Sequence, residues 1–436
     1  MDRRKFAGVA AGAVACRLTG ADRPRMDAAK LEATLTALSL IGRPAGGSFY
    51  SGVSRIGYSD EDIAGRAFIT GLMKKAGAKV RVDAAGNIFA ERAGTDASLA
   101  PLLFGSHIDS VPGGGNFDGC LGSVSAVQIL QTLEDAGVRT RRPLTAVVWA
   151  CEEASFAGLS LNGSRAAAGE MQAAELKTVS NGLVKADAIR RIGGDPTRIG
   201  EARIAKGAYH AYVELHIEQG GTLARRKIPI GVVDGIVSVD SYDVVVTGEP
   251  NHAGTTPMGE RQDALIGAAK LTLAVRELVM SETGAQVGTV GHIDVSPNAS
   301  NVIPGEVRMS IELRDLSASK IEVVGEKIRS RAAAIAKENR TEIRMTRKGH
   351  HDPAMASVEI QRVIEKAARK LGLASVHLPS GAAHDAQMMA KMMPMGMIFV
   401  PSVGGVSHSP KELSSWEDCA NGANVLLETI LELAAT

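Results

Sequence analysis

The stretch "GSHIDSVPGGGNFDG", Gly105–Gly119, begins where the apolar run at 101–104 ends. It carries His107, Asp109 and Asp118 on a segment that is otherwise mostly Gly, Ser, Asn and Pro. In open α/β sheets, ligands bind in the crevice beyond the carboxyl ends of the strands. The stretch therefore predicts a functional site at the end of a buried strand.

The segments around this stretch predict the rest of the sheet. "LAPLLFGSH" and "PLTAVVWACEE" are short continuous apolar runs, and the stretch between them at 122–136 is helical. This order is typical of an α/β fold with a buried, mostly parallel sheet covered by helices. Further helices are expected at 26–41 and at 60–76, with Ser59 as the N-cap. "AKVRVDAAGNIFAERAG" predicts a hairpin.

The pattern changes after about residue 235. "VSVDSYDVVVTGEP" and "EVRMSIELRDL" alternate with period two, as half-exposed antiparallel strands do. We expect a smaller α+β insert with the order strand, helix, strand, strand, helix, strand. The expected division is a leader at 1–25, a catalytic domain at 26–237 and 348–436, and a lid and dimerisation domain at 238–347.

Composition excludes several classes of protein. The chain has 436 residues and a formal net charge of +1, so no global bias favours nucleic acid or an anionic membrane. Aromatic residues make up 3%, too few for a base-stacking surface. The four cysteines form no CxxC motif and no recognisable disulfide framework.

The N-terminus, "MDRRKFAGVAAGAVAC", has the pattern of an export signal. Arg3 and Arg4 precede a short apolar run that is too short to span a membrane, and the pair resembles a twin-arginine signal. Ala13-Val14-Ala15 is a candidate cleavage site, and Cys16 directly after it is instead a candidate for a lipid anchor. We expect a periplasmic protein; the alternative is a cytoplasmic enzyme that begins with a frayed amphipathic segment.

Further His and Glu residues follow other apolar runs. Glu152 and Glu153 end one of them, His216 lies in "ELHIEQGG", and His408 lies in "GGVSHSP". Singly, each is more often a solvated surface residue than a ligand. Together with His107 and Asp118 they form a nitrogen and oxygen donor set without thiolates, which suits Zn²⁺ or Mn²⁺. An Asp shared by two ions is the pattern of a two-metal hydrolase.

With these motifs in view, the sequence resembles the M20 superfamily of metal-dependent amidohydrolases. Within it, the chain is similar to the branch of N-carbamoyl-L-amino acid hydrolases, β-ureidopropionases and allantoate amidohydrolases. The motifs that carry the resemblance run in family order: "GSHIDSVPGGGNFDG", "CEEASF", "ELHIEQGG", "GEPNHAGTTPMGERQDA", "PNASNVIPG", "SGAAHDAQMMA" and "VPSVGGVSHSP".

The resemblance implies two divalent ions per subunit, Zn²⁺ or Mn²⁺, with Co²⁺ and Ni²⁺ as further candidates. It implies Asp118 as the bridge between the ions and the following metal ligands: His107, Glu153, His216 and His408. Asp109 is then expected to hold the second ring nitrogen of His107. Glu152 is expected to be the general base that takes a proton from the attacking water and passes it to the leaving nitrogen.

The resemblance also implies substrate contacts. His252 is expected to stabilise the oxyanion from the partner subunit of a homodimer formed through the insert. Asn301 and Arg314, expected on the second and third strands of the insert, are implied as a pair that binds the substrate carboxylate. Gln219 is expected at the ureido or amide group, and Gly381 and Ala382 on a loop against the substrate. No role is assigned to the neighbouring His384 and Asp385.

The expected reaction is hydrolysis of a C–N bond in an N-carbamoyl-L-amino acid or a related ureido acid. Allantoate or ureidoglycolate hydrolysis shares every motif and stays an alternative. An aminoacylase or dipeptidase keeps the metals but changes the bond, and Arg314 with "HIEQG" argues against it. A metal-free binding protein is a further alternative, against which the intact donor set argues. "EEASFAGLS" lacks the family's usual Arg in this motif, which leaves the exact substrate open.

Overall fold

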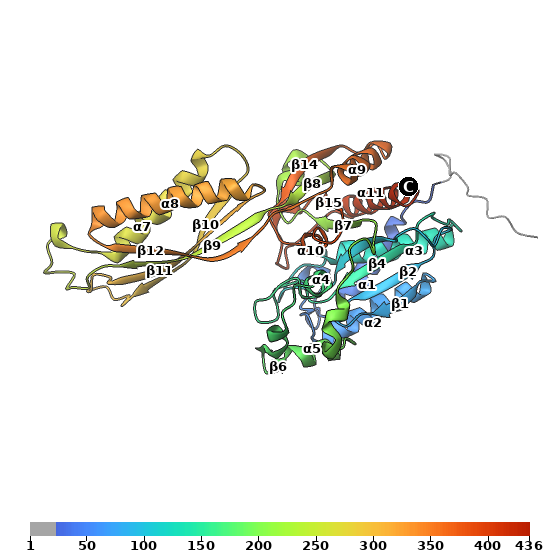
Figure 1. Cartoon of the computed structure of the whole chain (residues 1–436), viewed down its shortest axis with the longest axis horizontal. Helices are drawn as coiled ribbons and strands as arrows, with labels where there is room; N and C mark the ends of the chain where they lie inside the picture. The colour runs from blue at the N-terminus through green and yellow to red at the C-terminus, as the bar shows by residue number, and fades with distance from the viewer. Residues whose placement is uncertain (1–22) are drawn as a thin grey trace, which may run out of the picture.

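The computed structural model describes residues 23–436. A nine-stranded mixed sheet forms the centre of a larger domain, and a four-stranded sheet forms the centre of a small domain that projects from it (Figure 1). The expected α/β class with a smaller α+β unit is confirmed.

The large sheet has the order β1-β2-β4-β3-β7-β15-β8-β13, with β14 also paired to β8. Its four central strands are parallel, whereas β1, β2 and β13 pair antiparallel and β15 pairs antiparallel with β8. The parallel character is therefore confined to the centre, where the site forms, and to β14. The strands are β1 (Lys79–Val82), β2 (Ile88–Arg92), β3 (Leu102–His107), β4 (Leu144–Trp149), β7 (Tyr212–Ile217), β8 (Ile230–Ile236), β13 (Ala354–Met355), β14 (Ser375–Ser380) and β15 (Met395–Val400).

The sheet opens between β3 and β7. β3 pairs with β4 along all of its residues, and β7 does the same with β15. Between β3 and β7 the register holds only two pairs, Leu103 with Tyr212 and Phe104 with Val213. The carboxyl ends of these two strands therefore diverge, and the crevice that a parallel sheet offers to a ligand lies between them.

Helices cover both faces of the large sheet because its central strands are buried on both sides. Leu, Ile and Val side chains of five helices share one core: α1 (Ala28–Ser39), α2 (Asp60–Lys75), α3 (Cys120–Asp135), α9 (Val358–Lys370) and α11 (Trp416–Leu433). The opposite face packs against α4 (Asn162–Ala168), α6 (Thr222–Arg226) and α10 (Asp385–Met389). The predicted hairpin forms as β1 and β2, and Ser59 caps α2 by accepting from the Asp62 N–H.

The segment between β4 and β7 is made of short elements. Besides α4, it contains η2 (Ala173–Lys177), β5 (Val179–Ser180), β6 (Leu183–Val184), α5 (Lys185–Arg191) and η3 (Pro196–Ala202). Two other single turns occur in loops of this domain, η1 (Phe49–Ser51) and η5 (Val403–Gly405).

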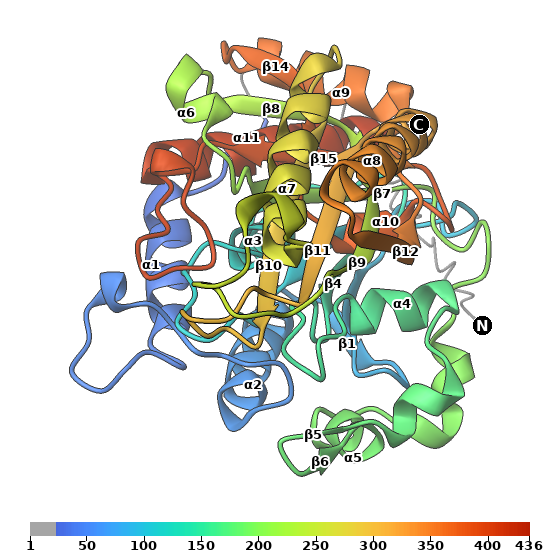
Figure 2. The same ribbon diagram turned by 90° about the vertical axis from the view of Figure 1, so that its left-hand side faces the viewer.

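The small domain has the predicted order of elements. It consists of β9 (Ser238–Thr247), η4 (Met258–Glu260), α7 (Ala264–Ser281), β10 (Val287–Ser296), β11 (Glu306–Asp315), α8 (Ala318–Asn339) and β12 (Glu342–His351). The sheet order is β10-β11-β9-β12, antiparallel throughout. The helices α7 and α8 pack together against one face of this sheet (Figure 2).

The expected leader falls mostly on residues 1–22, including Cys16, and these lie outside the described residues. Within the described part, Arg23 forms an ion pair with Glu428 of α11 at 2.8 Å. Cys120, Cys151 and Cys419 are buried and free. No helix in residues 23–436 combines the length and apolar character that crossing a membrane requires.

Candidate metal centre

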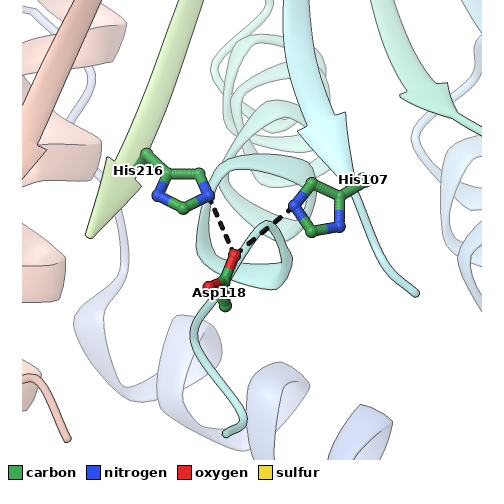
Figure 3. Close-up of side chains that lie close together, drawn as sticks. All are labelled: His107, Asp118 and His216. Carbon is green, nitrogen blue, oxygen red and sulfur yellow. Dashed lines mark ion pairs between the residues drawn. The ribbon is translucent and has the colours of Figure 1, made fainter. Parts of the chain in front are cut away.

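Two histidines from the diverging strands meet one carboxylate. His107 is the last residue of β3, and His216 lies near the end of β7. Their Nε2 atoms lie 3.5 Å and 3.1 Å from the same oxygen, Oδ1 of Asp118 (Figure 3). All three residues are buried, and together they form a group that could hold one metal ion.

A second group uses the other oxygen of Asp118. Nε2 of His408 lies 3.5 Å from Asp118 Oδ2 and 3.5 Å from Glu153 Oε2. Glu153 follows β4 and is buried, whereas His408 is exposed on the loop before α11. Asp118 thus belongs to both groups, one oxygen to each, which is the arrangement that a bridging carboxylate requires.

Backbone conformation brings these side chains together. Gly119 has φ +61° and precedes α3, and a Cβ there would lie 2.3 Å from Nε2 of His107. Only glycine leaves room for the histidine at this turn. Cys151, Gln219 and His408 also have left-handed φ values of 50°, 57° and 54°. Non-glycine residues adopt this conformation rarely, and such residues cluster at functional sites.

Asp109 acts mainly through the backbone of the two glutamates. Its carboxylate accepts from the N–H groups of Glu152 and Glu153, each at 3.1 Å. His107 Nδ1 lies 3.0 Å from the main-chain carbonyl of Asp109, nearer than the carboxylate at 3.7 Å. Asp109 therefore contacts the second ring nitrogen of His107, as expected, but by its carbonyl. Its carboxylate fixes the turn that carries Glu152, whose Oε2 lies 3.8 Å from His107 Nε2.

Three further side chains hold Asp118. Gln219 and Ser407 donate to Oδ2 at 2.7 Å and 3.0 Å. Glu412 accepts from the Asp118 N–H at 3.1 Å, and its Oε2 lies 2.9 Å from the Ser407 hydroxyl oxygen. The sequence analysis assigned no role to Ser407 or Glu412. Their position in the segment "SHSPKE", beside His408, could have indicated them. Gln219, expected at the substrate, lies against the Asp118 carboxylate.

The electrostatics show that the residues present fit divalent cations. Burial raises the pKa of Glu153 to about 7, with the Asp118 charge adding to the effect, and burial also raises that of Glu152 well above its ordinary value. Oε1 of Glu153 is buried and has no hydrogen-bond partner. Clustered buried carboxylates are costly unless cations compensate them. A donor set of imidazoles and carboxylates without thiolates suits Zn²⁺ or Mn²⁺.

Arg314 connects the small domain to a loop of the larger one. It lies near the end of β11, and its guanidinium donates to the carbonyl of Gly381. The adjacent Ala382 donates its N–H to Ser380 Oγ at 3.2 Å. Arg314 and the loop expected against the substrate are thus neighbours.

His252 and Asn301 lie at the other end of the small domain. Asn301 is in the loop between β10 and β11, not on the second strand as predicted, and its carbonyl accepts from the Ala253 N–H at 3.0 Å. This loop leads into the start of β11, whereas Arg314 is near its end, about 25 Å away at the rise of an extended strand. Asn301 and Arg314 are therefore not side by side within one chain, because β11 runs the length of the domain between them.

A buried polar cluster lies beneath the first metal group. Glu214, on β7, is fully buried and was not singled out from the sequence, although an acid inside the apolar run "YVELHI" was a usable signal. His384 packs against His216, with ring centroids 4.4 Å apart, and Asp385 is fully buried. His384 is the N-cap of α10 and Asp385 is its first residue, so the start of this helix packs against His216.

Known proteins share this architecture. The profile of peptidase family M20/M25/M40 matches residues 103–432. An N-carbamoyl-L-amino acid amidohydrolase of Geobacillus stearothermophilus is 40% identical over 385 residues, covering 88% of this chain and 94% of the relative. A ureidoglycolate hydrolase of Arabidopsis thaliana is 37% identical over 391 residues, covering 88% and 82%.

A solved structure agrees with them. The crystal structure of an amidase of the hydantoinase/carbamoylase family from Burkholderia multivorans superposes with a TM-score of 0.86 at 33% identity, covering 94% of this chain and 99% of that one. The profile, the sequence relatives and the fold agree with the donor groups at the open edge of the sheet, and the chain belongs to the M20/M25/M40 peptidase family.

Proposed function

We propose that this protein is a divalent-metal amidohydrolase that cleaves the C–N bond of an N-carbamoyl-L-amino acid or a related ureido acid. The observation that carries the proposal is the pair of donor groups that share Asp118, with Glu152 beside them. Hydrolysis of an N-carbamoyl amino acid consumes one water and gives the amino acid, ammonia and carbon dioxide.

His107, Asp118 and His216 would hold one divalent ion, and Asp118, Glu153 and His408 a second. Zn²⁺ or Mn²⁺ bound there supplies Lewis-acid polarisation of the scissile carbonyl and lowers the pKa of water toward neutrality. Gln219 and Ser407 keep the bridging carboxylate oriented through their hydrogen bonds to its Oδ2. The chain's remaining task is to move protons and to bind the substrate.

Glu152 is the proposed general base. Its carboxylate lies beside His107 but belongs to neither donor group, so it is free to accept a proton from the attacking water. The same carboxyl then donates that proton to the leaving nitrogen. Burial raises the pKa of the Glu152 carboxyl above its ordinary value, and a raised pKa favours a carboxyl that returns the proton it accepts.

His252 and Arg314 are the proposed substrate groups of the small domain. Nδ1 of His252 accepts from the N–H groups of Gly254 and Thr255 at 3.0 Å and 3.2 Å. A neutral ring held in this way carries its hydrogen on Nε2, which can donate to a developing oxyanion. Arg314 suits the substrate carboxylate because its planar guanidinium can bind it in a bidentate manner.

This assignment requires a homodimer, which we propose forms through the small domain. His252 and Asn301 lie at the opposite end of the small domain from Arg314, so a second copy can bring them to the centre served by Arg314. Exposed apolar residues on α7 and on the edge strand β10 offer an interface: Leu273, Met280, Val287 and Ile293. An edge strand presents unpaired backbone groups that can pair with another chain.

Ureidoglycolate or allantoate hydrolysis is the second candidate, favoured by the likeness to the Arabidopsis hydrolase. Ammonia release by protein loaded with Mn²⁺ tests both, on a panel of N-carbamoyl-L-amino acids, ureidoglycolate and allantoate, with dipeptides followed by free amino acid. Chelator-sensitive ammonia from an N-carbamoyl-L-amino acid is the expected result. Turnover of ureidoglycolate or allantoate alone would select the second candidate, and turnover of dipeptides alone would overturn both.

We also propose twin-arginine export to the periplasm, supported by Arg3 and Arg4 ahead of the short apolar run. Cell fractionation with N-terminal sequencing tests it. A mature protein in the periplasm without Met1 is expected, and a cytoplasmic protein that retains Met1 would overturn it.

A further inference from the structure

His107 and His216 of the first metal group are on β3 and β7. These two strands are not hydrogen-bonded to each other at their carboxyl ends. The β3–β7 register ends at Phe104 and Val213, three residues before His107 and His216. The first turn of α3 lies in the opening, where a Cβ on Gly122 would be 2.2 Å from the Leu215 carbonyl oxygen. Backbone pairing between β3 and β7 therefore does not set the distance between the two rings.

Glu214 spans this opening. Its Oε1 accepts from the hydroxyl of Ser106, the residue before His107, at 2.6 Å. Its Oε2 accepts from the Ala386 N–H at 3.0 Å and lies 3.1 Å from the Tyr212 hydroxyl oxygen. One fully buried carboxylate thus joins β7, the end of β3 and the start of α10.

The surrounding groups extend the same connection. The Tyr212 hydroxyl also lies 2.8 Å from the Gly105 carbonyl and accepts from the Trp149 indole N–H at 3.0 Å. Trp149 ends β4, three residues before Glu152. All three strands that lead into the metal site are therefore linked by a single buried network.

We propose that Glu214 is a positioning residue that fixes the spacing of His107 and His216, and so sets the affinity of the first group for its metal ion. The proposal rests on the proposed metal-dependent function. Glu214 is not itself a ligand, because both of its oxygens already accept hydrogen bonds from the protein and it belongs to neither donor group. Removing groups that orient metal ligands typically costs about 10- to 100-fold in metal affinity or activity.

The position predicts a graded response to substitution. Glu214→Ala leaves the Ser106 hydroxyl and the Ala386 N–H without their acceptor in a dry interior and releases the end of β3. Glu214→Gln keeps the shape and one acceptor oxygen, so it is expected to recover much of the loss. Ser106→Ala removes only the contact to β3 and is expected to weaken metal binding in the same direction.

The test measures Co²⁺ affinity, by competition with a fluorescent chelator, in two single-group backgrounds of the full chain. His408→Ala leaves the group built on His107 and His216, whereas His216→Ala leaves the group built on Glu153 and His408. Glu214→Ala is expected to weaken Co²⁺ binding about 10- to 100-fold in the first background and to leave it unchanged in the second.

Glu428→Gln is the matched control: Glu428 is also a buried glutamate, but it pairs with Arg23 and Lys370 on the outer face of α11. It is expected to lower the unfolding temperature without changing Co²⁺ affinity. If Glu214→Ala does not fold, Glu214→Gln and Ser106→Ala carry the same test.

The possible failures are distinguishable. A wild-type chain that binds no Co²⁺ would overturn the proposed metal-dependent function. Normal binding by the wild type with unchanged affinity in the Glu214 and Ser106 variants would overturn the positioning role alone. Equal weakening in both backgrounds would reduce Glu214 to a general structural residue.

Discussion

The candidate metal groups and the proposed substrate residues of the small domain differ in one respect. A single chain brings the metal groups together, but it keeps the substrate residues apart. His107, Asp118 and His216 come from β3, the loop before α3 and β7, yet all three are buried and both histidine Nε2 atoms lie within 3.5 Å of Asp118 Oδ1. His252 and Asn301 are exposed and lie about the length of β11 from Arg314. In the proposed function, the reaction centre is therefore built within one chain, and a second copy would supply part of the substrate site.

The difference follows from the surroundings of each group. A buried carboxylate or imidazole must have its polar atoms satisfied, so the fold fixes it through contacts such as those of Asp109 and Glu412. An exposed histidine on a surface turn is held only by backbone groups of the same turn. His252, for example, accepts at Nδ1 from the Gly254 N–H. The centre is therefore expected to tolerate substitution poorly, and the substrate residues are expected to act only in the assembled protein.

Glu152→Gln should have the largest effect on activity. It tests whether Glu152 is a general base rather than a metal ligand. The amide cannot accept the proton, so kcat is expected to fall about 10²- to 10⁴-fold. Metal content, measured by elemental analysis after dialysis, is expected to stay at the wild-type value. Loss of metal along with activity would instead make Glu152 a ligand.

His252→Ala should follow and tests the division between two copies. Loss of an oxyanion donor is expected to lower kcat about 10²- to 10³-fold with metal content intact. Mixing equal amounts of His252→Ala and Glu152→Gln, after dissociation and reassembly, should then restore about one quarter of the wild-type activity if each site in a homodimer takes His252 from its partner. A mixture as inactive as its components would place His252 in its own chain's site.

Arg314→Ala should have a smaller effect and tests the part of the substrate site that one chain does complete. A charge-assisted hydrogen bond contributes about 1.5–3 kcal/mol, so KM is expected to rise about 10- to 100-fold with kcat little changed. Arg308→Ala, on the same strand and paired with Glu306, is the control. Unchanged KM for substrates with a free carboxylate would remove Arg314 from the site.

Features that depend on local sequence pattern could be predicted, and these include the strand ends that carry the candidate metal ligands. The apolar runs that become β3 and β4 are continuous because both faces of these strands are buried, so the polar residues that follow them mark the strand ends. That argument places His107 and Glu153 without knowledge of the topology. The period-two pattern likewise predicted the small domain's order of elements.

Other features depend on tertiary geometry. Glu412 acts on Asp118 from 294 positions away, and no local pattern carries that pairing. Asn301 and Arg314 are close in sequence but separated in space, because the strand between them is extended. The opening between β3 and β7, and hence the place of Glu214 in it, follows from a register that sequence alone does not determine.

The small domain joins the larger one at the start of β9 and the end of β12. His350 lies at this junction, and its substitution should give the smallest effect. Asp240 on β9 accepts hydrogen bonds from His350 and Arg347 of β12, both at 2.6 Å, while Asp352 lies 3.0 Å from the other ring nitrogen of His350. The hydrogen bond with Asp240 raises the pKa of His350 above its ordinary value of 6.5. Burial opposes this shift, Asp352 adds to it, and the nearby Arg347 charge opposes it.

Because this folded-state pKa is raised, His350 stabilises the fold fully below about pH 6.5, and that stabilisation is lost as the pH rises through the folded-state value. His350→Gln should therefore lower the unfolding temperature more at about pH 6 than at about pH 9, by at most about 2 °C since the pair is partly exposed. Calorimetry at both pH values checks this, with His351→Gln, exposed at the end of β12, as the control. An equal difference at both pH values would mean that His350 carries no charge at the base of the small domain, and that Arg347 alone neutralises Asp240.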